Sequence, residues 1–234
     1  MANLGDVQRW HCLFEQSGTF KAQFQKLGFL AYDYDVLDAY GQTDHKIDLF
    51  ETIEKCFAGE PTFFDDLGFG DAIIAFFPCV RFEAQIIMQM RGVAFQLKDK
   101  TESEKLRVSL KLAEEQLMLY RYLCHLCMIC LEKDIPLVVE NPYSTQSFLN
   151  RYFPIQPAVV DMDRRRNGDY FSKPTQFFFF ACKPFDNPLL DEPIDYYPTQ
   201  KVVVARGAER SMLSPCYARR FIRSYLMGAW YDNG

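Results

Sequence analysis

The chain has 234 residues, of which 49% are hydrophobic and 24% are charged. This length and composition fit one large α/β domain with a sizeable core, so we expect a single domain over residues 1–234. The formal net charge of −5 excludes a protein that coats duplex DNA through a strong basic field. Any contact with nucleic acid must therefore come from local basic clusters.

The sequence shows neither a signal peptide nor an apolar run of about 18 residues, so we expect a cytoplasmic protein without a membrane span. Its eight cysteines are scattered rather than arranged as a disulfide framework, which favours reduced thiols. The chain is rich in aromatic residues, with 22 Phe and 13 Tyr. We expect some of these rings to line a pocket for a planar ligand.

Apolar runs alternate with helical patterns, which predicts βαβ units and a doubly wound, mostly parallel, Rossmann-like sheet. In the first part of the chain the expected elements are a strand over 10–14, a helix over 20–27, a strand over 29–34, a short element over 47–49 and a helix over 50–57. Residues 71–77 form the clearest strand, because the run is short, continuous and apolar, as in a strand covered on both faces.

Apolar residues recur at helical spacing between residues 102 and 132, which predicts a long helix. Further strands are expected over 137–139, 176–181 and 201–205, followed by a final helix from Ser214-Pro215 to about Met227. Cys124, Cys127 and Cys130 lie inside the long helix with a spacing similar to that of a metal cluster. Residues three apart share one helical face, so core packing is favoured over a metal site.

Chemically distinctive residues follow the expected strands at one edge of the sheet, where open α/β sheets bind their ligands. The first such turn contains Ser17, Gly18 and Thr19. Its glycine allows a close backbone approach, and the N–H groups at the start of the next helix favour an anionic group. Asp35 follows the second strand and can accept both hydroxyls of a ribose, with Asp33 as the alternative.

Two further strands end in candidate catalytic residues. Cys79 follows Pro78, where a thiolate can act as a nucleophile and a small buried thiol is the alternative. Glu140 ends the next buried strand, where a carboxyl near a cleft can stay protonated and donate its proton. An ordinary hydrogen bond in a loop is the alternative for Glu140. The basic run 163–166 is either a solvated turn or a site that binds an anion.

The ordered set of these residues resembles the DNA cytosine-5 methyltransferases, and most closely the short members of phages and mobile elements. The resemblance rests on the turn 14–20, Asp35, Asp48, Phe77-Pro78-Cys79, Glu140-Asn141-Pro142, the segment 168–175 that ends in Lys-Pro-Thr, and residues 210–215. Each motif is short, but their order and spacing over roughly residues 10–226 are together fairly specific. The resemblance implies the class I methyltransferase fold, S-adenosylmethionine as cofactor and DNA as partner.

In that family's chemistry, Cys79 would attack carbon 6 of a flipped cytosine and Glu140 would protonate or hydrogen-bond nitrogen 3. Carbon 5 would then take the methyl group. Arg165, from the basic run, would hold the cytosine carbonyl or a phosphate. The resemblance implies that Phe14 would contact the adenine of the cofactor, Asp35 its ribose and Asp48 its adenine amino group. It also places Ser17, Gly18, Thr19 and Pro78 in the cofactor site.

The chain departs from the family pattern at several positions. Gln16 replaces the first glycine of the cofactor turn, and Phe77 replaces a proline. The stretch between the Lys-Pro-Thr element and the last motif is shorter than a typical target-recognition domain, so we expect that domain to be short or absent. Two alternatives to a DNA methyltransferase follow: an inactive accessory protein that binds S-adenosylmethionine or DNA, and a methyltransferase for a free nucleotide. The pairing of Cys79 with Glu140 favours the DNA enzyme.

Overall fold

The structure is a computed structural model and describes residues 3–188, 193–195 and 212–228. Its strands are β1 (Arg9–Leu13), β2 (Leu30–Asp35), β3 (His45–Lys46), β4 (Asp71–Phe76), β5 (Leu137–Pro142), β6 (Val159–Asp161) and β7 (Thr175–Phe180). They form one seven-stranded sheet with the order β3-β2-β1-β4-β5-β7-β6. Strands β1 to β5 run parallel, and β7 is antiparallel to both of its neighbours. The expected α/β class with a mostly parallel, Rossmann-like sheet is thereby confirmed.

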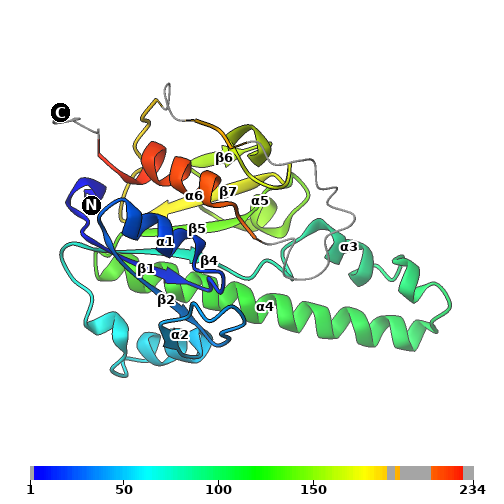
Figure 1. Ribbon diagram of the computed structural model, residues 1–234. Coiled ribbons are helices and arrows are strands. Elements are labelled where there is room, and N and C mark those ends of the chain that lie inside the picture. Colours follow the sequence, from blue (N-terminus) through cyan, green and yellow to red (C-terminus); the bar gives the residue numbers. More distant parts are fainter. Residues whose placement is uncertain (1–2, 189–192, 196–211, 229–234) are drawn as a thin grey trace.

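Helices cover both faces of this sheet (Figure 1). They are α1 (Thr19–Lys26), α2 (Leu49–Phe57), α3 (Ala84–Met90), α4 (Glu102–Glu132), α5 (Phe148–Tyr152) and α6 (Pro215–Phe221), which continues as a π-helical turn over Ile222–Leu226. Short 3-10 helices lie at Leu4–Asp6, Phe63–Asp65, Phe95–Leu97 and Arg164–Asn167. In Figure 1, α1 and α6 lie above the sheet, and α2 and α4 lie below it.

Two apolar cores follow from the alternation of side chains along buried strands. In β4, Ile73 and Ala75 point into the core shared with α2 and α4, while Ala72 and Ile74 point into the core shared with α1 and α6. All four side chains are fully buried, which explains why the strand is apolar from Ala72 onwards. The sheet is therefore held rigidly from both sides, and its edge can position side chains accurately.

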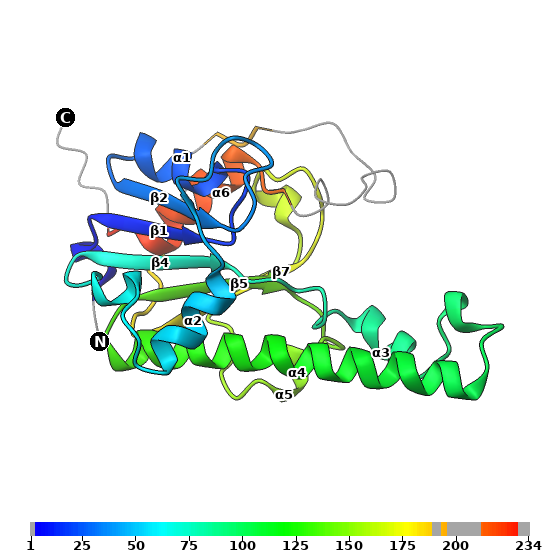
Figure 2. The ribbon, with the colours of Figure 1, turned by 90° about the horizontal axis from the view of Figure 1, so that it is seen from below.

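The ends of the helices carry the signals that the sequence suggests. Thr101 and Glu104 form a reciprocal capping box at the start of α4. Ser214 caps α6 by accepting a hydrogen bond from the Tyr217 N–H, and Pro215 occupies the first helical turn. The N-terminal half of α4 extends beyond the sheet, with α3 alongside it (Figure 2).

Several sequence-based boundaries need correction. The short third element is β3 at His45–Lys46, and the predicted span 47–49 instead leads into α2. No sequence pattern indicated α3, α5 or β6, which are short and lie between the clearer elements. The predicted strand 201–205 falls outside the described residues. All eight cysteines are free thiols. No helix in the described part of the chain combines the length and the apolar character that crossing a membrane requires.

Candidate functional site

A cavity of about 380 Å³ opens at the carboxyl ends of β1, β4 and β5. The chain leaves β1 towards β2 and leaves β4 towards β5, in opposite directions along the sheet. The cavity thus lies at the topological switch point, where α/β sheets bind ligands. Five of the residues singled out in the sequence line it together, namely Phe14, Ser17, Pro78, Cys79 and Glu140. The cavity wall also includes Met212 and Leu213 from the last sequence motif.

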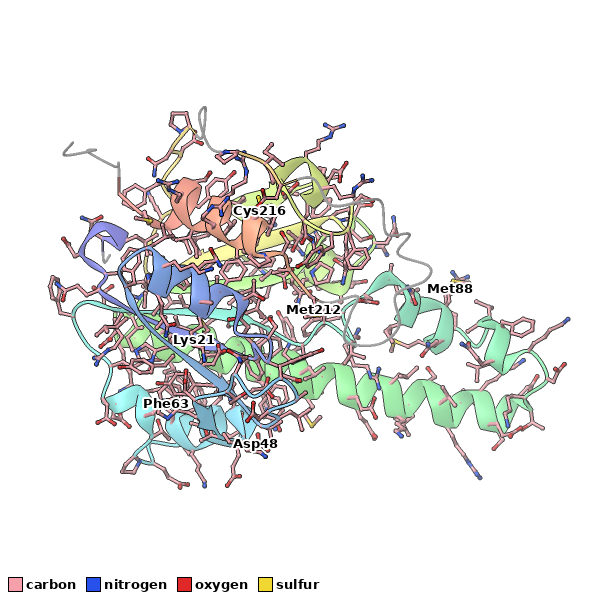
Figure 3. The ribbon with its side chains drawn as sticks, in the orientation of Figure 1. Lys21, Asp48, Phe63, Met88, Met212 and Cys216 are labelled. Carbon is pink, nitrogen blue, oxygen red and sulfur yellow. The ribbon has the colours of Figure 1, made fainter. Side chains whose placement is uncertain are left out.

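The remaining predicted site residues are not among those that line this cavity in the described part of the chain: Gly18, Thr19, Asp35, Asp48 and Arg165. Asp48 is exposed and caps α2, because its Oδ1 accepts hydrogen bonds from the N–H groups of Phe50 and Glu51 at 3.0 and 3.1 Å. Figure 3 shows Asp48 on the α2 side of the sheet, whereas Cys216 lies on the α6 side. An aspartate before a helix is a common N-cap, and the structure gives Asp48 that role.

Asp35 ends β2 with its carboxylate folded back onto its own loop. Its Oδ1 accepts a hydrogen bond from the Leu37 N–H at 2.8 Å. Burial raises the pKa of Asp35, and the N–H groups of Leu37 and Val36 oppose the rise. Asp33, the alternative, is fully buried beneath the turn after β1, with Lys21 Nζ 3.6 Å from its Oδ2. Neither carboxylate faces the cavity as a ribose acceptor would.

The turn after β1 is built around Glu15, which the sequence analysis did not select. Its carboxylate accepts hydrogen bonds from the N–H groups of Phe20 at 2.7 Å and Lys21 at 3.3 Å. The start of α1, expected to attract an anionic group of a ligand, is therefore already occupied by a carboxylate of the chain itself. Ser17 and Thr19 share a hydrogen bond of 2.9 Å between their hydroxyls.

Gly18 is required by packing rather than by contact with the cavity. It has a φ of +63°, and a Cβ at this position would lie 3.0 Å from the Gln42 Cβ and 3.3 Å from Asp33 Oδ2. The loop after β2 thus lies directly over the turn. The same loop brings Tyr40 to the cavity wall, 42% exposed. Tyr40 was not predicted, because its only signal in the sequence was an aromatic residue in the loop after β2.

Phe14 is the strained residue of the site. Its φ of +60° is uncommon for a residue with a Cβ. The neighbouring ring centroids of Phe50 and Phe77 lie 5.3 Å from its own. Backbone strain held by such packing concentrates at functional positions. Phe14 therefore presents a fixed aromatic wall to the cavity.

Cys79 is half-buried and donates a hydrogen bond to Glu83 Oε1, with an Sγ–Oε1 distance of 3.4 Å. Burial raises the pKa of the Cys79 thiol to about 12, Lys173 lowers it, and the carboxylates of Glu83 and Glu140 raise it. The thiol is therefore neutral at pH 7 in this structure, and it needs a proton acceptor before it can act as a nucleophile. Glu83 is the group placed to take that proton.

Glu140 reaches the same cavity from the end of β5. The Thr175 hydroxyl donates a hydrogen bond to Glu140 Oε1 and so fixes the orientation of its carboxyl. The next residue, Asn141, donates from Nδ2 to the Phe77 carbonyl at 3.1 Å. This bond ties the end of β5 to the turn that carries Cys79. The strands thus hold the thiol and the carboxyl in one fixed relation.

The basic run contributes Arg164, not Arg165, to the cavity wall. The Arg164 side chain is 2% exposed, and its Nε lies 2.8 Å from Asp169 Oδ2. In the described part of the chain its buried Nε and Nη2 find no hydrogen-bond acceptor with good geometry. Asp169 is held in turn by the Ser214 N–H at 2.8 Å. Arg164 therefore holds a positive charge in the cavity wall beside the Asp169 carboxylate, and this charge favours an oxygen-bearing ligand.

Two groups of cysteines and carboxylates bear on metal binding. Ligand atoms of Cys12, Glu15 and Asp33 lie within 4.8 Å of one another, fully enclosed under the turn. The ammonium of Lys21 beside Asp33 disfavours a further cation there. In α4, Cys127 and Cys130 pack into the apolar core, as expected.

Neither a scan against models of known protein families nor a search of curated proteins found a match for this chain.

Proposed function

We propose that the chain is an S-adenosylmethionine-dependent methyltransferase that acts on carbon 5 of cytosine in DNA. One observation carries the proposal: Cys79 and Glu140, from two different strands, line one cavity at the switch point of the sheet. The resemblance to the cytosine-5 methyltransferases requires this convergence.

In this proposal Cys79 is the nucleophile. Its S–H bond breaks, the proton passes to Glu83, and the freed electron pair forms a bond with carbon 6 of the base. Once carbon 5 carries the methyl group, water would take the proton from carbon 5. The electron pair of that C–H bond would restore the double bond between carbons 5 and 6 while the bond to sulfur breaks, and Cys79 would recover its proton from Glu83. Glu140, fixed by Thr175, hydrogen-bonds or protonates nitrogen 3 and makes the ring more electrophilic. Arg164, in place of Arg165, lies in the cavity wall, where its positive charge would attract the base carbonyl or a phosphate. A base inside a duplex would have to leave the stack to reach these groups.

Other residues of the cavity wall suit the cofactor. Phe14 and Tyr40 provide aromatic walls for an adenine ring, and Ser17, Met212 and Leu213 also line the cavity. A volume of about 380 Å³ lies in the range of small-molecule sites. When bound, S-adenosylmethionine supplies an electrophilic methyl group. Asp35 and Asp48, both engaged with backbone N–H groups, contribute to the pocket only through the loops that they stabilise.

The test is methyl transfer from labelled S-adenosylmethionine to mixed-sequence DNA. We expect the wild-type protein to label DNA and Cys79→Ser to lose the activity by about 100-fold or more, because a hydroxyl is a far weaker nucleophile. Cys56→Ser is the matched control, since Cys56 is also half-buried but packs under α4, away from the cavity. Equal labelling by wild type and Cys79→Ser would remove Cys79 as the nucleophile.

One observation favours a second candidate, a protein that binds S-adenosylmethionine without transferring its methyl group. The Cys79 pKa of about 12 leaves very little thiolate at pH 7 in the ligand-free protein. Calorimetric titration separates the two candidates. Binding of the cofactor together with no label on DNA, on free cytidine nucleotides or on RNA would favour the accessory protein.

A further inference from the structure

Three leucines form an exposed stripe on the half of α4 that extends beyond the sheet. Leu106, Leu110 and Leu117 are 71%, 62% and 68% exposed. Their spacing places them on one face of the helix, with Ala113 between them. Figure 2 shows this half of α4 standing clear of the strands. Exposed leucines in a row on a projecting helix indicate an interaction surface.

The opposite face of the same helix is already used. Leu112 and Leu119 are buried on that side, where α4 packs against α3 and the body of the protein. Arg81 reaches Glu115 there with a 2.6 Å ion pair. The leucine stripe is therefore not the face through which α4 is attached. Within the described residues, its three leucines remain open to solvent.

The stripe has the repeat of a coiled-coil seam. From Leu106 the positions advance by four, three and four residues to Leu110, Ala113 and Leu117, which is the alternation of a heptad repeat. Such a seam is buried only when a second helix packs against it. We propose that this second helix is α4 of another copy of the same chain, packed antiparallel about a two-fold axis.

The charges beside the seam match an antiparallel pair. Arg107 and Glu114 are exposed, lie seven residues apart on the same edge of the stripe, and carry opposite signs. When Leu106 packs against the partner's Leu117, and Leu110 against the partner's Ala113, Arg107 faces the partner's Glu114. The two-fold axis forms this ion pair twice.

The shape of the chain favours the same orientation. The C-terminal half of α4 is packed into the body, and the N-terminal half projects (Figure 2). An antiparallel pair puts the two bodies at opposite ends of the paired helices, whereas a parallel pair would push the bodies against each other. The seam from Ser103 to Tyr120 is about 27 Å long at 1.5 Å per residue. An interface of this size is small, so we expect a dimer that forms in the micromolar range.

Sedimentation velocity of the full chain tests the proposal over a concentration range up to about 100 µM. We expect reversible dimers for the wild type and at least about tenfold weaker association for Leu110→Lys. Phe69→Lys is the control, because Phe69 is 92% exposed in a loop outside α4. Circular dichroism checks that each variant keeps its helix content, which substitutions at exposed positions should not alter.

Charge reversal decides the orientation. Arg107→Glu and Glu114→Arg should each weaken the dimer, because each places two like-charge pairs across the axis. The double variant R107E/E114R should restore wild-type association, because both pairs are attractive again. Three outcomes would overturn the proposal. The wild type could stay monomeric at the highest concentration, Leu110→Lys could dimerise as strongly as wild type, or the double variant could associate more weakly than either single variant.

Discussion

Gly168 locks the turn that carries Arg164, and replacing it by alanine should destabilise the protein strongly. Its φ is +86°, and a Cβ there would lie 2.5 Å from the Cys216 Sγ and 3.2 Å from the Cys216 Cβ. The left-handed backbone costs about 1–2 kcal/mol for alanine. Forcing a methyl group into a filled site costs about 1–3 kcal/mol more. We expect Gly168→Ala to lower the free energy of unfolding by about 2–5 kcal/mol.

A double-mutant cycle with Cys216→Ala separates the two causes. Removing the Sγ relieves the closest contact, so the double variant should be about 1–2 kcal/mol more stable than the sum of the single effects predicts. The left-handed backbone and the Cβ–Cβ contact remain, so the relief is partial. Urea unfolding followed by circular dichroism gives all three values. A Gly168→Ala variant within about 0.5 kcal/mol of wild type, or strictly additive effects, would refute the reasoning.

Three further predictions concern ionisable groups. Burial raises the pKa of Asp33 to about 9, so the folded state keeps a proton that the unfolded state releases above about pH 4. This contribution to stability is complete below pH 4 and is lost as the pH rises towards 9. Asp33→Asn should therefore raise the free energy of unfolding at pH 8 by about 1 kcal/mol or more relative to wild type, and have a smaller effect at pH 4. Urea unfolding at pH 8 and at pH 4 measures both effects. Equal effects at the two pH values would mean that the Asp33 carboxyl is ionised in the folded protein. Removing the carboxylate that accepts the Cys79 hydrogen bond in Glu83→Gln should lower the thiol pKa and speed its alkylation by iodoacetamide at pH 8, measured by mass spectrometry. An unchanged rate would mean that Glu83 does not control the thiol. The Asp71 carboxyl is buried, which opposes ionisation, but the hydrogen bonds from Arg9, the Gly68 N–H and His11 together outweigh this and lower its pKa to about 2. Asp71→Asn should cost about 1–3 kcal/mol at pH 7, and the loss should shrink as the pH falls from 4 to 2, the range in which wild type itself loses the ion pair.

The sequence predicted the central strands and the long helix because their patterns are strong. The apolar run of β4 and the capped, 31-residue helix α4 leave little choice of structure. The three-residue strand β6 carries no comparable pattern. It becomes a strand only because it pairs with β7, and a short stretch of sequence does not reveal a pairing with a strand further along the chain.

The site was predictable where strand order alone decides the location. Cys79 follows β4 and Glu140 lies near the carboxyl end of the neighbouring parallel strand β5, so their meeting follows from the fold. The sequence alone could not show that Asp48 caps α2, because an aspartate before a helix can bind a ligand or cap the helix, and the sequence is the same in both cases. Arg164 could not be distinguished from Arg165, since only the buried position of Asp169 selects one of the two.

The central claim is that the cavity at the ends of β1 and β4 binds S-adenosylmethionine, and calorimetric titration tests it most directly. Wild-type protein should bind the cofactor with a dissociation constant in roughly the micromolar range. Tyr40→Ala, which removes an aromatic wall from an exposed loop, should weaken binding about tenfold. Tyr152→Ala, on the exposed side of α5, should bind like wild type. No binding heat for wild type at millimolar cofactor, or equal affinity in Tyr40→Ala, would contradict the account.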